Sequence, residues 1–257
     1  MSLASVVTQA EKKLILDGLT SSDGEVRRLS VEQLPQLGIE EAVPHLADKL
    51  GDEVWRVRKA AVERLVRCID HPPVQEILIE SLADGEDPGR RNAAFEALVA
   101  CGSRVTPRLI DELANPDIDV RKLVVDAVAA IADPDARRPL VRLLADPDTN
   151  VRAATAEALG MVGGSEEVDS LLTAIRSEDE DLLVRLSALR SLVRLEADVS
   201  VETLGLTLDE SILRPSALTL LGMSEDPSAA DVLIKALGSK SRSGRDAAMG
   251  AVLQRLG

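Results

Sequence analysis

One short pattern recurs along the whole chain and restricts its fold more than any other feature. An arginine, in most copies preceded by valine and followed by small and apolar residues, returns about every 31 residues. A regular period of this length is typical of solenoids, in which each repeat packs against its neighbours. The eight arginines, called the column arginines below, are Arg27, Arg58, Arg91, Arg121, Arg152, Arg185, Arg214 and Arg245.

Each repeat contains two helical patterns. An apolar segment such as AVPHLADKL (42–50) forms the first, or A, helix, and the segment around the column arginine forms the second, or B, helix. No segment shows the period-two alternation of a strand. The sequence therefore predicts an all-α fold, an α-solenoid (superhelix) of about eight stacked two-helix repeats in a single domain, 1–257. The repeats are expected at residues 3–38, 40–69, 73–102, 105–132, 134–163, 165–196, 199–224 and 227–257.

The B helices show how the repeats pack. The residue before each arginine and those four and seven positions after it lie on one arc, which we expect to be buried. Small residues three positions after most arginines let neighbouring helices approach closely, in keeping with only 1% aromatic residues. The residues four positions after the arginines are Val31, Val62, Phe95, Val125, Ala156, Leu189, Leu218 and Met249.

Charged residues and glycines mark the ends of the B helices. The column arginines lie at the edge of the buried arc, so each is expected to pair with a carboxylate of its own or the adjacent repeat. Glycines at the helix ends (Gly38, Gly102 and Gly163) are expected to adopt left-handed backbone conformations. Acidic residues four positions before six arginines can cap the helices: Asp23, Asp87, Asp117, Asp148, Asp181 and Glu210.

The most regular copy runs from Asp148 to Gly160. Its pattern, Asp-x-x-Val-Arg-x-Ala-Ala-x-x-Ala-Leu-Gly, resembles the HEAT-like repeats, of a bacterial type, first associated with phycobilisome lyases. The resemblance extends over the whole chain, although the copies at Arg91, Arg214 and Arg245 depart from the pattern. It implies the solenoid fold and, because such repeats serve mostly as scaffolds, a protein or peptide partner.

The composition restricts the partner and the location. A formal net charge of −14 should repel nucleic acid and anionic membranes. No apolar run approaches the ~20 residues of a membrane span, and the N-terminal sequence lacks the basic start and apolar stretch of a secretory signal. We therefore expect a cytoplasmic protein.

Residues with catalytic or metal-binding chemistry are few. Cys68 and Cys101 occupy a core position of their repeats and are expected to be free thiols. The only histidines, His45 and His71, lack a second ligand at a metal-like spacing, and the acidic run at 177–183 lacks the spaced ligands and central glycine of a calcium loop. We expect no enzymatic activity, no cofactor and no metal.

A partner is expected on the side of the solenoid that the B helices line, which is usually concave. The residue five positions after the arginine points away from the buried arc, and in five successive repeats it is acidic. The later repeats carry apolar residues and an arginine instead. The predicted partner-binding residues are Lys59, Glu63, Glu96, Lys122, Asp126, Glu157, Met161, Leu186, Arg190 and Met223.

These patterns predict a non-enzymatic scaffold that binds a protein or peptide of unknown identity. The resemblance leaves open a second function, that of a bilin lyase or chaperone for chromophore attachment. A more remote alternative is a nucleic-acid-binding helical repeat, which would need a basic groove and aromatic side chains. The charged rows also fit a solvated face without a partner.

The last helix suggests a further contact. The segment GRDAAMGAVLQRLG (244–257) combines apolar residues with few charges, whereas a terminal repeat needs a polar outer face. It predicts either a longer protein or end-to-end or dimeric association through the C-terminal repeat.

Overall fold

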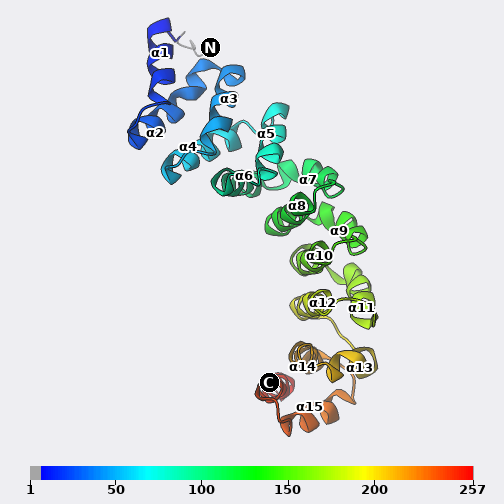
Figure 1. Ribbon diagram of the computed structural model, residues 1–257. Helices are drawn as coiled ribbons and strands as arrows, with labels where there is room; N and C mark the ends of the chain where they lie inside the picture. Colours follow the sequence, from blue (N-terminus) through cyan, green and yellow to red (C-terminus); the bar gives the residue numbers. More distant parts are fainter. Residues whose placement is uncertain (1–6, 257) are drawn as a thin grey trace. The chain divides into compact units, whose positions relative to one another are not determined.

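The computed structural model describes residues 7–256, and in this range it contains helices and no strand (Figure 1). The expected start of the first repeat at residue 3 and the last residue, 257, lie outside the described residues. The chain divides into two compact units, Met1–Asp111 (unit 1) and Glu112–Gly257 (unit 2).

From residue 7 onward, unit 1 contains three complete pairs of helices and the A helix of a fourth. Short 3-10 segments, Leu34–Leu37 and Gly102–Val105, connect some of them. The helices are α1 (Gln9–Gly18), α2 (Gly24–Gln33), α3 (Ile39–Lys49), α4 (Trp55–Arg67), α5 (Pro72–Leu82), α6 (Pro88–Cys101) and α7 (Thr106–Glu112).

Unit 2 begins with a B helix and continues with four complete pairs. Its 3-10 segments are Pro134–Ala136 and Ser165–Glu167. The helices are α8 (Ile118–Ile131), α9 (Arg137–Leu143), α10 (Thr149–Val162), α11 (Val168–Arg176), α12 (Leu182–Arg194), α13 (Val201–Asp209), α14 (Arg214–Met223), α15 (Ala229–Leu237) and α16 (Arg242–Leu256).

The helices of each unit form two layers. The B helices pack on one another in chain order, α2–α4–α6 in unit 1 and α8–α10–α12–α14–α16 in unit 2 (Figure 1). The A helices α1, α3, α5, α9, α11, α13 and α15 each pack on the B helix that follows. This arrangement confirms the predicted all-α solenoid, since each helix pair buries its apolar face against the next.

The core lies between the two layers, where the sequence places it. Leucines seven positions after the arginines, such as Leu34, Leu65 and Leu159, are fully buried. The expected arc is wrong at the first and last B helices, where Val26 is 41% and Met249 is 51% exposed. Within residues 7–256, α2 and α16 each have a B-helix neighbour on one side only, so that part of their arc is not covered there.

Three column arginines join consecutive repeats in the expected manner. The Arg121 Nη1 donates to the carbonyls of Asn115 and Pro116 in its own loop, and its Nε and Nη2 donate to both carboxylate oxygens of Asp146, at 2.8 and 3.0 Å. Arg27 binds Asp52 and Arg152 binds Glu180 in the same way. Each arginine thus connects the loop of its own repeat to the loop of the next one.

Asp146 is the most buried carboxylate of these pairs. Burial by itself raises its pKa, but the Arg121 hydrogen bonds, the Asp148 amide and the nearby arginine charges together lower that pKa below its ordinary value of 3.8. A carboxyl whose pKa is lower in the folded than in the unfolded chain contributes stability above the unfolded pKa. That stability is lost as the pH falls through the folded pKa.

The stability contributed by Asp146 should therefore disappear in acid. We expect Asp146→Asn to lower the free energy of unfolding by a constant amount between about pH 5 and pH 7, and by progressively less below about pH 4. Urea titrations of the wild type and the variant across this range measure the difference. A difference that stays the same down to about pH 3 would show that the charge of Asp146 is not what stabilises the fold.

Three expectations need correction, and two of them concern the helix ends. Aspartates 23, 87, 117, 148 and 181 cap their helices as predicted, but Glu210 does not cap α14. That helix starts at Arg214, because Pro215 lacks an amide hydrogen and fits only in a first turn. Gly163 has an ordinary φ of −71°, whereas Ala132 and Glu196 adopt left-handed conformations.

The third correction concerns the column arginines, each of which was expected to pair with a carboxylate. Within residues 7–256 no ion pair forms at Arg58, Arg91, Arg185, Arg214 or Arg245, and Arg58, Arg214 and Arg245 donate to backbone carbonyls instead. The most buried of the five is Arg185. Its side chain is buried, and its Nε and Nη2 have no hydrogen-bond partner. The acidic residue 25 positions later, which pairs with the column arginine in the cases of Arg27 and Arg121, is here Glu210, and it is exposed in the loop before the shortened α14. Arg185 therefore does not connect the repeats of α12 and α14 by an ion pair.

Two glycines determine how closely the B helices of unit 2 approach one another. A Cβ atom at Gly160 of α10 would lie 2.4 Å from the Ser191 Oγ of α12, and one at Gly222 of α14 would lie 2.8 Å from Ala251 of α16. Both glycines are eight positions after their column arginines. The α10–α12 and α14–α16 contacts therefore require glycine at this position.

Candidate functional site

The exposed side of the B helices, called the B-helix surface below, carries most of the predicted partner-binding residues. In unit 1, Lys59 and Glu63 project from α4 and Glu96 from α6, and all three are exposed. They lie one and five positions after the column arginine, on the opposite side of the helix from the buried leucine.

The most distinctive residue of this surface is Trp55, which sequence reasoning did not select. It is the first residue of α4, it is 57% exposed, and the guanidinium of Arg56 lies 5.6 Å from the centre of its ring. The signal was present in the sequence, since Trp55 is the only tryptophan and lies one turn before Lys59 on the same helix face.

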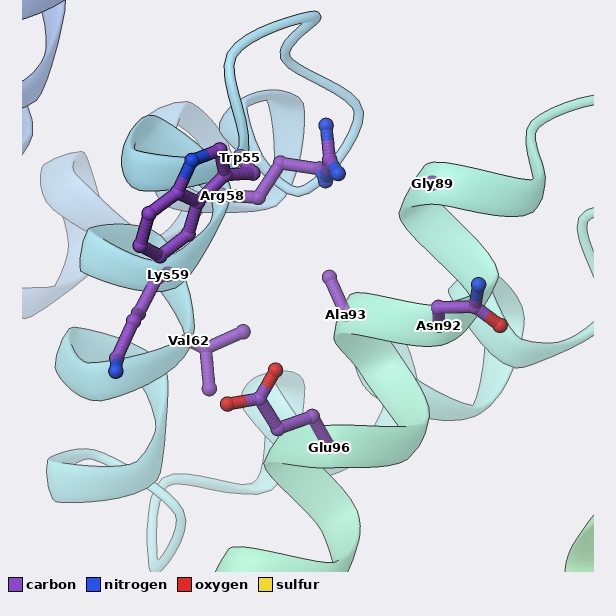
Figure 2. A pocket seen from close by; sticks show the side chains of 8 residues that line it. All are labelled: Trp55, Arg58, Lys59, Val62, Gly89, Asn92, Ala93 and Glu96. Carbon is purple, nitrogen blue, oxygen red and sulfur yellow. The ribbon is translucent and has the colours of Figure 1, made fainter.

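Trp55 separates two grooves in unit 1. The α4–α6 groove has a volume of about 250 Å³ and is lined by Trp55, Arg58, Lys59, Val62, Gly89, Asn92, Ala93 and Glu96. Figure 2 shows Val62 of α4 and Ala93 and Glu96 of α6 facing the space between the two helices. The α2–α4 groove, of about 210 Å³, is lined by Arg28, Glu32, Trp55, Arg56, Lys59, Ala60 and Glu63.

The charged groups of these grooves differ in whether they are already paired. Arg28 pairs with Glu25 and Glu32 on its own helix, and its hydrogen bonds lower the pKa of Glu25. By contrast, within residues 7–256, Lys59, Glu63 and Glu96 make neither a hydrogen bond nor an ion pair. Their charges are available to a ligand.

In unit 2 the predicted residues fall into two groups. On α8, Lys122 and Asp126 form an ion pair of 2.7 Å, so that they largely neutralise one another. On α10, Glu157 and Met161 are exposed one turn apart, and Met161 is 48% exposed.

The remaining predicted residues lie farther along unit 2. Arg190 of α12 is exposed, whereas Leu186 and Met223 are half-buried and offer less apolar surface than expected. Arg190 lines a third groove, the α12–α14 groove, of about 210 Å³, together with Val193, Pro215, Ser216, Thr219 and Ala247.

Groups suited to catalysis or metal binding are scarce in the described range. No cluster of three or more His, Cys, Asp and Glu side chains there could hold a metal ion. Cys68 and Cys101 are free thiols, as expected, and burial raises the pKa of the Cys101 thiol to about 11. No helix between residues 7 and 256 is long and apolar enough to cross a membrane.

Comparison with known protein families gives a direct match. The family model of HEAT repeats matches residues 13–99 and 106–193. The chain belongs to the HEAT-repeat family. The matched residues extend from α1 to α12, and the match confirms that the segment from Asp148 to Gly160 belongs to a HEAT repeat.

Solved structures share this HEAT-repeat fold at low sequence identity. The chain is similar to the Escherichia coli protein YibA, with 18% identity, 95% of this chain and 92% of that chain covered, and a TM-score of 0.54. It is similar to Kap95p, in a structure that contains RanGDP, with 14% identity, 96% and 42% coverage and a TM-score of 0.54.

A phycobilisome lyase is also among the similar solved structures. The phycocyanin lyase complex of CpcE and CpcF from Nostoc is 20% identical, with 99% and 98% coverage, but its TM-score is 0.38. No curated protein sequence matches the chain.

Proposed function

We propose that this protein is a non-catalytic scaffold that binds a segment of a partner protein on its B-helix surface. HEAT repeats commonly mediate protein binding, and the related Kap95p binds RanGDP. The observation that carries the proposal is the position of Trp55, which is exposed between two grooves whose other groups include unpaired charges.

The chemistry of this position suits a protein partner. A tryptophan supplies a large, rigid apolar contact, and such residues dominate the binding energy of many interfaces. The nearby Lys59, Glu63 and Glu96 can form charge pairs that orient the partner and increase the rate of association. The grooves are shallow and rimmed by charge, unlike the mostly apolar pockets that enclose small ligands.

Replacement of Trp55 by alanine should remove this contact without unfolding the chain, because the ring is mostly exposed. With immobilised wild-type protein and Trp55→Ala, we expect a defined partner in cell extract to be retained by the wild type and reduced about tenfold or more on the variant. Quantitative mass spectrometry measures the ratio. Binding of the purified partner should also shift the emission of Trp55, since the chain has no other tryptophan and no tyrosine.

A matched control is Ile234→Ala, which removes an exposed apolar side chain from the A helix α15. It should leave the captured partner unchanged. Equal losses with Trp55→Ala and Ile234→Ala, or no loss with Trp55→Ala, would exclude the tryptophan as the binding contact.

A further inference from the structure

The α12–α14 groove of unit 2 exists because two B helices are kept apart at one register position. At the eighth residue after the column arginine, α10 and α14 carry Gly160 and Gly222, against which the next B helix packs directly. At the same position α12 carries Val193, which is half-buried and lines the groove. A valine prevents the close approach that glycine allows, so space remains between α12 and α14.

The groove has a simple charge pattern. Arg190 is the only charged residue in its lining, and the others are apolar or carry hydroxyl groups. Within the described residues, Arg190 is exposed and forms neither an ion pair nor a hydrogen bond. The Thr219 hydroxyl donates to the Pro215 carbonyl at 3.0 Å, whereas the Ser216 hydroxyl makes no such bond in this part of the chain. The groove thus offers a guanidinium and a free hydroxyl.

These donors match a carboxylate. A guanidinium binds the two oxygens of a carboxylate through parallel hydrogen bonds, and the charges cancel one for one. A phosphate dianion would leave uncompensated negative charge, which a protein with a net charge of −14 disfavours. Beside the carboxylate site, Val193, Pro215 and Ala247 present apolar surface for a neighbouring side chain.

We propose that the α12–α14 groove binds an aspartate or glutamate of a partner peptide, with its carboxylate on Arg190 and Ser216 and an adjacent apolar side chain against Val193 and Pro215. This inference rests on the proposed scaffold function and assigns a ligand chemistry to one part of the B-helix surface. The α12–α14 groove differs from the two grooves beside Trp55, whose linings contain charges of both signs.

The proposal can be tested with a library of random peptides of about twelve residues, displayed on phage and selected on the full chain. We expect enrichment of sequences in which Asp or Glu stands next to an apolar residue. Synthetic copies of these peptides should bind Arg190→Gln at least about tenfold more weakly than the wild type, because a charge-assisted, bidentate contact is lost. Arg190→Lys should bind more tightly than Arg190→Gln but more weakly than the wild type. Lysine keeps the positive charge but lacks the planar pair of donors that binds both carboxylate oxygens.

The matched control is Arg194→Gln, which makes the same charge change one turn later on α12 at an exposed position outside the groove. Peptides that bind this control as weakly as Arg190→Gln, or enriched peptides that are basic, would overturn the proposal. Peptides that lose affinity with Trp55→Ala but not with Arg190→Gln would overturn it while supporting the scaffold function. Failure to select any peptide would contradict both.

Discussion

Replacement of Arg121 by alanine is expected to lower the free energy of unfolding by about 3–5 kcal/mol, the range found when one partner of a buried ion pair is removed. The variant leaves the carboxylate of Asp146 buried without its guanidinium, and the carbonyls of Asn115 and Pro116 lose their donor. Two consecutive loops of unit 2 would then lose their connection. Denaturation by urea, followed by helical circular dichroism, measures the change.

The neighbouring Lys122 provides the control on the same helix. It forms an ion pair with Asp126 on the surface, where both side chains are more than one-third exposed. Exposed pairs contribute little, so Lys122→Ala should change the free energy of unfolding by less than about 0.5 kcal/mol. Similar losses for both variants would mean that burial of the Arg121–Asp146 pair does not determine its contribution.

The fold could be predicted from the sequence because most repeats have the same residue types at the same structural positions. The spacing of the column arginines gave the helix pairs, and the aspartate four positions before most of them marks where the B helix begins, as at Asp117 and Asp148. These arginines and aspartates are constrained by contacts inside the repeat and with the next repeat. They therefore recur wherever the neighbouring repeat is regular.

Where a neighbour is absent or irregular, the same reasoning was wrong. Met249 occupies a core position but is exposed, because no further B helix covers that side of α16 within the described residues. Arg185 has the right register, but the shortened α14 of the next repeat does not bring a carboxylate to it. A pattern within one repeat contains no information about such defects in the next.

The candidate site was predicted only in part for a related reason. Outward positions are free of packing constraints, so their occupants vary and no period distinguishes a ligand contact from a solvated residue. Sequence spacing placed Lys59, Glu96 and Arg190 on the exposed side correctly. It did not show that Trp55 lies between two grooves, or that Asp126 is already paired with Lys122.

Replacement of Gly160 by valine is expected to lower the free energy of unfolding by about 2–4 kcal/mol. A side chain at this position would collide with the Cα, Cβ and Oγ atoms of Ser191, within 2.4–2.8 Å of its Cβ. Such overpacking costs about 1–3 kcal/mol. Separation of α10 from α12 would also break the buried hydrogen bond from the Ser191 hydroxyl to the Ala156 carbonyl, which contributes about 1 kcal/mol more.

Gly250→Ala is the matched control, because this glycine also lies inside a B helix but has no atom within 4 Å of an added Cβ. Because no steric clash offsets the higher helix propensity of alanine at this position, the variant should be more stable than the wild type by about 0.5–1 kcal/mol. The two glycine variants should thus change the urea midpoint in opposite directions. A Gly160→Val protein as stable as the wild type would show that the α10–α12 contact accommodates a side chain at this position. The valine at the same register of α12 would then no longer explain why a groove opens beside Arg190.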